Sequence, residues 1–150
     1  MRDALPSLFN GMPDPEAVRA LEHAMMSLPQ VDLLTQHLVH GGMYARTIFI
    51  PAGTVLTGAQ TKQDNVCVVF GDITVTTDEG AQHLTGFHVL PAKAGAKRAG
   101  IAHGDTWWTT LFTTERTEVA DIERDLTDEA DLLQTNRPGI EFAPVNTLEG

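Results

Sequence analysis

The chain is short of several residue types, and each shortage excludes a class of protein. Its 150 residues include one cysteine, Cys67, so no disulfide can form within the chain and folding does not depend on an oxidising compartment. Ten Lys and Arg stand against 20 Asp and Glu, which gives a formal charge of −10. Because binding to a nucleic-acid backbone depends on clustered cations that release counterions, this balance argues against nucleic acid as a partner.

Long apolar runs are also missing. No stretch approaches the roughly 20 apolar residues of a membrane-spanning helix, so we expect no membrane insertion. The first residues, 1–16, lack the apolar core of a signal peptide, so we expect no secretion by that route. The protein is expected to stay in the cytoplasm of the host cell that makes it, or to leave that cell inside a particle.

Motifs that announce a common enzyme class are absent from the sequence. It contains no Gly-x-Ser-x-Gly, no Walker-type phosphate loop, no Cys-x-x-Cys pair and no paired-carboxylate signature. The few cations come closest to a cluster at Lys93, Lys97 and Arg98, in a segment of small residues. We interpret this cluster as a solvated loop, with a local anion site as the alternative.

What the chain does contain is a series of short segments rich in β-branched and aromatic residues, separated by Gly, Pro and Asp. Gly71-Asp72 is expected to turn the chain in one hairpin, and the residues 78–80 to close the next. The pattern predicts a mainly β domain of antiparallel strands. The predicted strands are 43–50, 66–70, 73–77, 83–91 and 101–114.

Helical periodicity flanks these strands on both sides. Asp14-Pro15 is a typical helix start, and apolar residues recur at helical spacing up to Leu28, which predicts a helix over 14–28. A second helix is predicted to begin at Thr117, as N-cap, and to end near Leu126. The C-terminal arm that follows, 127–150, carries scattered apolar residues and is expected to dock on a partner, separable from the barrel.

Length and composition suit one globular domain. We divide it into an N-terminal arm, helix and lead-in (1–42), a barrel (43–114), and an acidic helix with a C-terminal arm (115–150).

Three segments carry a resemblance to a known family: YARTIFIPAGT (44–54), AGAKRAGIAHGDTWWTT (94–110) and the acidic segment after them. Over roughly 37–126 the chain resembles small single-domain cupins, and most of all the cupin-like proteins encoded by tailed bacteriophages. The resemblance implies a cupin-like antiparallel jelly-roll barrel, with an N-terminal helix and a short C-terminal helix plus arm.

The resemblance also implies where a metal would be held, and the ligands are missing there. Relatives usually carry histidines after the Pro-Ala-Gly turn, where this chain has Thr61 and Asn65, and only His103 remains from the second half-site. Because one imidazole is not a transition-metal site, we expect no metal and no other cofactor. An unusual metal site is kept as a weak alternative, drawn from His37, His40, Asp64 and His103.

Alternation along the predicted strand 101–114 assigns side chains to its two faces. His103, Asp105 and Trp107 share one face, and Trp108 lies on the other. The residues expected to line the pocket are Thr61, Asn65, His103 and Trp107. The enzymatic alternative is a metal-free isomerase in which His103, paired with Asp105, acts as the general base.

The non-enzymatic reading is favoured. It makes the protein a non-catalytic scaffold or assembly module, a decoration or structural component of a phage particle, by analogy of fold. The predicted helix 14–28 has an apolar stripe, the strand 43–50 is apolar on both faces, and the arm 127–150 adds more apolar surface. One small barrel cannot easily cover all three, so we expect a homo-oligomer and contacts with other structural proteins of the particle.

Overall fold

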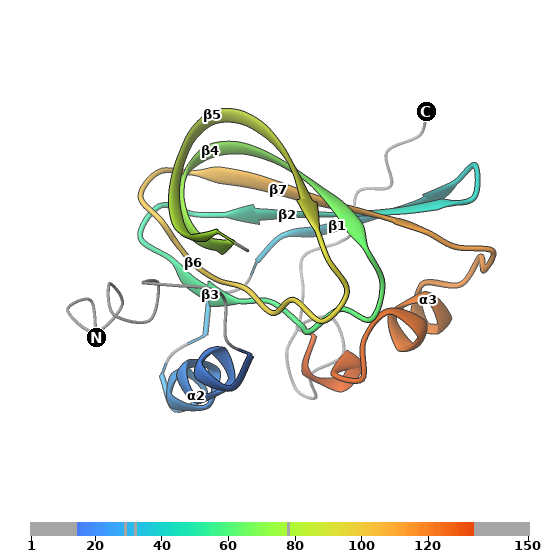
Figure 1. Cartoon of the computed structure of the whole chain (residues 1–150), viewed down its shortest axis with the longest axis horizontal. Coiled ribbons are helices and arrows are strands. Elements are labelled where there is room, and N and C mark those ends of the chain that lie inside the picture. The colour runs from blue at the N-terminus through green and yellow to red at the C-terminus, as the bar shows by residue number, and fades with distance from the viewer. Residues whose placement is uncertain (1–14, 29, 32, 78, 134–150) are drawn as a thin grey trace.

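The structure is a computed structural model that describes residues 15–28, 30–31, 33–77 and 79–133. Seven antiparallel strands form one sheet that curls into a half-barrel, in the order β1-β2-β7-β4-β6-β3, with β5 paired to β4 (Figure 1). The prediction of a mainly antiparallel β fold is confirmed. The strands are β1 (Thr35–His40), β2 (Met43–Ile50), β3 (Val55–Thr57), β4 (Asn65–Thr77), β5 (Gly80–Ala92), β6 (Ala99–Ala102) and β7 (Thr106–Thr113).

Strand β4 corrects one predicted turn. The chain does not turn back at Gly71-Asp72 but continues through it as one strand, and there β4 exchanges one neighbour, β7, for another, β6. A Cβ on Gly71 would lie 2.5 Å from Oγ1 of Thr106, so only glycine lets the start of β7 come this close. The backbone N–H of Asp72 donates to the same hydroxyl at 3.1 Å. Gly71 therefore marks a close crossing of strands, and not a hairpin.

The sheet contains one hairpin that was predicted and one that was not. The predicted hairpin at 78–80 is confirmed, since Thr77 at the end of β4 pairs with Gly80 at the start of β5. At the other edge, the predicted lead-in contains a strand, β1, joined to β2 by Gly41-Gly42 with φ of 60° and 74°. Positive φ at both turn residues is what a tight two-residue hairpin needs. The sheet therefore begins before the expected boundary at Met43.

The predicted strand 101–114 is wrong as a single element. It is divided into β6 and β7, and the connection between them consists of His103, Gly104 and Asp105. The backbone N–H groups of His103 and Gly104 both donate to the carbonyl of Asp72, at 2.8 and 3.1 Å. These bonds fix the connection as a turn against β4, so alternation does not run through it.

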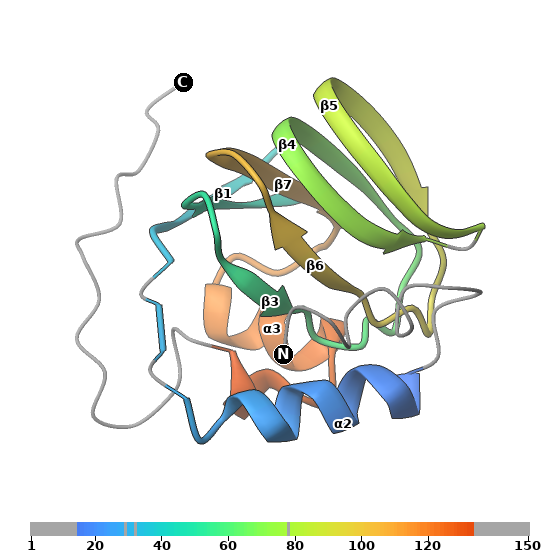
Figure 2. The same ribbon diagram turned by 90° about the vertical axis from the view of Figure 1, so that its left-hand side faces the viewer.

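Helices α2 (Pro15–Met25) and α3 (Val119–Leu126) cover different parts of the sheet (Figure 2). Val18 and Leu21 of α2 pack against the outer face of β3 and β6. Ile122 and Leu126 of α3 pack on Tyr44 and close one end of the curl. The core inside the curl is Ile50, Cys67, Val69, Ile73, Val75, Leu84, Ala92 and Ala102.

Both helices differ from their predicted bounds at one end. Helix α2 ends at Met25, before the predicted Leu28, and the predicted start at Asp14 lies outside the described residues. Helix α3 has Glu118 as its N-cap in place of Thr117. Among the described residues, no helix has the length and apolar character to cross a membrane.

The start of the predicted C-terminal arm packs against the rest of the domain. Thr127 and Ala130 are buried, and a short 3-10 helix, η1 (Ala130–Leu132), continues the packed chain after α3. The rest of that arm, 134–150, and the predicted N-terminal arm, 1–13, lie outside the described residues.

Candidate functional site: a cavity inside the curled sheet

A cavity of about 180 Å³ lies inside the curl. Its walls come from the inner faces of β2, β4 and β7, from the segments 58–61 and 96–100, and from α3. Ile48, Leu56, Trp108 and Phe112 are among the apolar side chains that make up most of the lining. Such a cavity can hold a small organic body, and its few polar groups decide which one.

Two arginines border this cavity. Arg98 is held in place, because its two terminal nitrogens donate to the carbonyls of Thr76 at 3.1 Å and Pro91 at 3.2 Å. Nε of Arg46 is different: it is buried, and no described residue accepts a hydrogen bond from it. A buried donor without a partner is costly and therefore uncommon in folded proteins.

Glu123 of α3 is the acidic residue of the lining, and it is buried. Two guanidinium groups and one carboxylate leave the wall with an excess of positive charge, in a chain whose formal charge is −10. This local excess favours an anionic ligand over a neutral or cationic one.

The neighbours of Arg46 do not add charge. Nδ1 of His37 lies 2.6 Å from the hydroxyl of Tyr44, and the two rings are stacked. Burial, and then the nearby Arg46, lower the pKa of His37 to about 4. Burial raises the pKa of Tyr44. At neutral pH both side chains are therefore uncharged, so neither His37 nor Tyr44 offsets the positive charge of Arg46.

Cys67 is a buried thiol in the wall. Burial raises its pKa, although Arg98 acts in the opposite direction. Because the thiolate is the nucleophilic form, this cysteine contributes packing and not covalent chemistry.

Two of the four residues predicted to line the pocket border the cavity, and two do not. Thr61 and Asn65 border the cavity. His103 lies in the turn outside it, where Nε2 is 2.8 Å from Oγ1 of Thr74. Trp107 is 40% exposed on the outer face, and Trp108 borders the cavity in its place. The adjacent tryptophans face opposite ways, as alternation requires.

The predicted catalytic pair, His103 and Asp105, does not border the cavity. Oδ1 of Asp105 accepts a hydrogen bond from the backbone N–H of Ala52 at 2.9 Å. His103 instead packs edge to face against His83, with ring centroids 5.0 Å apart. The turn between β6 and β7 is the physical reason, since it places both residues at the surface.

The alternative metal site is not assembled. His37 is engaged with Tyr44, the carboxylate of Asp64 accepts from the N–H of Ala94 at 2.8 Å, and His40 lies exposed on β1. Among the described residues, no three His, Cys, Asp or Glu side chains are grouped so that they could hold a metal ion.

Sequence reasoning missed Arg46 as a site residue and included Arg98 only in the alternative of a local anion site. A signal for Arg46 was present, because alternation along 43–50 put it on one face with Tyr44, Ile48 and Ile50. For Arg98 the favoured interpretation was a solvated loop, and the local anion site was the alternative.

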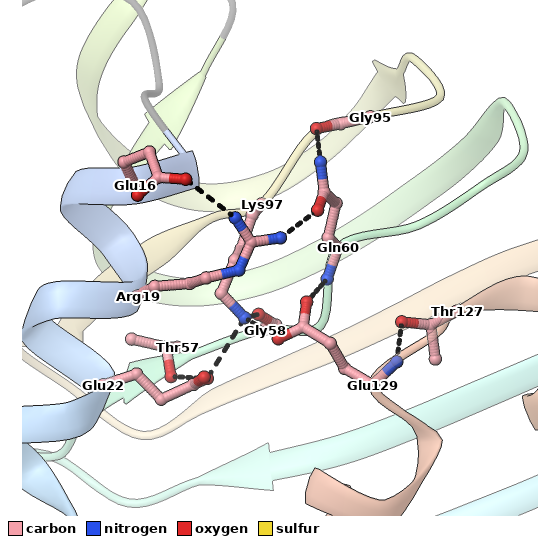
Figure 3. A network of polar contacts seen from close by, with 10 residues as sticks. All are labelled: Glu16, Arg19, Glu22, Thr57, Gly58, Gln60, Gly95, Lys97, Thr127 and Glu129. Carbon is pink, nitrogen blue, oxygen red and sulfur yellow. Dashed lines mark hydrogen bonds and ion pairs between the residues drawn. The ribbon is translucent and has the colours of Figure 1, made fainter.

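The same loop holds a buried lysine, which corrects that interpretation (Figure 3). Lys97 has no exposed surface, and its ammonium donates to Glu129 and to the carbonyl of Gly58, each at 2.8 Å, and to Glu22 at 3.2 Å. Burial acts to raise the pKa of Glu129, but the hydrogen bond from Lys97 holds it below its ordinary value. This cluster ties α2, the segment before β6 and the end of the described chain together.

A second hollow, of about 320 Å³, lies between α2 and the sheet. Arg46, Ile48 and Leu56 border both this hollow and the inner cavity. Arg46 therefore stands where the two spaces adjoin.

No family model matches the chain, and no curated protein matches it. Solved structures do. A cupin superfamily protein from Desulfitobacterium hafniense is 14% identical, with 61% of this chain and 86% of that chain covered and a TM-score of 0.48. KdgF from Halomonas sp. is 18% identical, with 58% and 84% covered and a TM-score of 0.49. A cupin domain from Bordetella pertussis is 14% identical, with 59% and 99% covered and a TM-score of 0.45.

The mainly β, antiparallel part of the predicted fold class is confirmed, and its cupin-like part stays a prediction. The curled sheet and its antiparallel order carry this conclusion. Two of these three structures are named as cupin proteins, and the resemblance of this chain to phage proteins stays a prediction.

Proposed function

We propose that the protein binds a small organic anion inside the curled sheet. The observation that carries the proposal is Nε of Arg46, a buried donor for which the described residues supply no acceptor. A bound carboxylate or similar oxyanion would accept from this nitrogen and would offset the excess positive charge of Arg46 and Arg98.

Size and lining restrict the ligand further. A cavity of roughly 150 Å³ lined by apolar side chains is known to hold one benzene molecule, so about 180 Å³ suits a body of one ring or its aliphatic equivalent. Trp108, Phe112 and Ile48 would contact that body, while the arginines would receive its charge. The proposal is therefore a ligand with one apolar end and one anionic end.

Benzoate and benzamide test the charge requirement, because they share a ring and differ in charge. We expect benzoate to raise the melting temperature and to give a titration by calorimetry, and benzamide to do neither. Arg46→Gln should abolish the response to benzoate. Arg124→Gln, which removes an exposed arginine on α3, should leave it unchanged.

Equal responses to benzoate and benzamide, or an unchanged benzoate response in Arg46→Gln, would contradict the proposal. A response lost equally in Arg46→Gln and Arg124→Gln would show a general charge effect and would also contradict it.

The second candidate is the assembly role in a phage particle that the resemblance implies. One observation favours it: the outer face of the sheet presents exposed apolar side chains, among them Phe70 and Phe87. Mass spectrometry of purified particles from infected cells tests this role. The chain should be present at a fixed stoichiometry to the major capsid protein, and its absence from the particles would contradict the role.

A further inference from the structure

The outer face of the sheet carries an apolar surface that crosses four strands. Register places Phe49 of β2 opposite Trp107 of β7, Trp107 opposite Phe70 of β4, and Phe70 opposite Phe87 of β5. The rings of Phe49 and Trp107 are in contact, with centroids 4.8 Å apart. An aromatic row therefore runs across the sheet, perpendicular to its strands.

Two further rows extend the surface along the strands. The next contains Val68 and Val89, opposite each other, and the third contains Val66 opposite Pro91, with Leu111 beside Val66. We call these three rows the outer apolar face. It is made up of the outward residues of β2, β7, β4 and β5 that lie in these three rows: Ala45, Thr47, Phe49, Val66, Val68, Phe70, Phe87, Val89, Pro91, Trp107, Thr109 and Leu111.

None of these positions is Asp, Glu, Lys or Arg, although 20% of the chain is charged. The two helices do not cover them, because α2 and α3 both lie at the opposite end of the curled sheet from the arch of β4 and β5 (Figures 1 and 2). Phe87, Phe70 and Val89 are 64, 59 and 57% exposed, and Val66 and Trp107 are each 40% exposed. Apolar side chains this exposed on neighbouring strands mark an interaction surface.

We propose that the outer apolar face is the interface of a symmetric homodimer. Area is the first argument. An aromatic side chain has roughly 150–250 Å² of surface and a valine somewhat less. The exposed fractions of the five most exposed members, three aromatic residues and two valines, together leave roughly 500 Å² open to solvent. Two copies face to face would bury about 1,000 Å², which reaches the lower limit of a specific interface, and the half-buried members of the face add to it.

Charge is the second argument. Two copies that each carry a formal charge of −10 repel at most orientations, and a face without ionised side chains offers the approach of least repulsion. A twofold axis also brings the same patch of both copies together, so one apolar face supplies both sides of the interface. The inference does not depend on the cavity ligand, and it gives the assembly candidate a partner, a second copy of the chain.

Sedimentation of the full chain over a wide range of micromolar concentrations is the direct test. We expect a monomer–dimer equilibrium that strengthens with added salt. Val89→Asp places a carboxylate in the interface of each copy, and we expect it to weaken the dimer by at least about a hundredfold, because an unpaired charge is costly to bury. Val31→Asp is the matched control, an identical change at an exposed valine outside the face, and should leave the equilibrium unchanged.

Tryptophan fluorescence tests independently whether the outer apolar face forms the dimer contact. In Trp108→Phe, Trp107 is the one remaining tryptophan, and its quenching by acrylamide should fall as the dimer forms. A chain that stays monomeric in low and high salt would overturn the inference. A dimer that Val89→Asp does not weaken would also overturn it. The same holds for a dimer in which acrylamide quenches Trp107 as strongly as in the monomer. None of these outcomes would alter the benzoate test of the cavity.

Discussion

The ammonium of Lys97 lies 2.8 Å from a carboxylate oxygen of Glu129, and the lysine side chain has no surface exposed to solvent. The second carboxylate oxygen of Glu129 accepts from the backbone N–H of Gln60 at 2.9 Å. This pair joins the segment before β6 to the chain that follows α3, so two segments far apart in sequence hold each other against the sheet.

Lys97→Met should therefore be strongly destabilising. The variant would leave the carboxylates of Glu22 and Glu129 without their cation, and breaking a buried ion pair costs about 3–5 kcal/mol of unfolding free energy. Lys62→Met is the control, because Lys62 makes an exposed ion pair with Asp128, whose loss should cost less than about 1 kcal/mol. Urea denaturation measures both, and equal losses would contradict the structural role given to Lys97.

The pair of His37 and Tyr44 predicts a dependence of stability on pH. The pKa of His37 is about 4 in the folded protein against 6.5 for an ordinary histidine. Between these values the unfolded chain binds a proton that the folded protein does not, so the unfolding free energy falls as the pH is lowered from 6.5 towards 4. His37→Gln should flatten this slope, while His40→Gln, at an exposed position on the same strand, should not. Unfolding curves across this pH range measure the slope, and an equal slope in wild type and His37→Gln would contradict the burial of a neutral imidazole.

The adjacent tryptophans should respond differently to truncation. Trp108→Ala removes a side chain from the cavity wall and should cost about 3–5 kcal/mol, as large-to-small changes in a core do. Trp107→Ala should cost much less in the monomer and should act mainly on association. Thermal unfolding at low protein concentration and sedimentation separate the two effects. The same loss of stability for both variants would contradict their opposite orientation.

Gly71 should not tolerate a side chain. In Gly71→Ala the new Cβ would meet Oγ1 of Thr106 at 2.5 Å and the carbonyl of Asp105 at 2.6 Å. Relieving such overlap typically costs about 1–3 kcal/mol, so the unfolding free energy should fall by that amount. Gly58→Ala is the control, since its nearest neighbour would lie 3.9 Å away. Urea denaturation compares them, and a Gly71→Ala protein as stable as Gly58→Ala would show that β4 and β7 do not cross closely here.

The sequence alone determined the features that depend on residues near each other in the chain. The alternation of 43–50 placed Arg46 with Tyr44 and Ile48, and the structure puts these side chains on the inner face. The hairpin at 78–80 and most of each helix followed from turn chemistry and apolar spacing, because the groups that form them are near neighbours in the chain.

Tertiary structure decided the features that depend on distant segments. Gly71 looked like a turn residue, but its position is fixed by contact with Thr106 on another strand. Lys97 looked like a solvated cation, but Glu22 and Glu129, from opposite ends of the described chain, meet it in the interior. His103 was expected in the pocket, but the carbonyl of Asp72 holds its backbone in an outer turn. The sequence records which groups exist, and only the packed chain decides which of them share a space, because burial and ion pairing depend on distance in three dimensions.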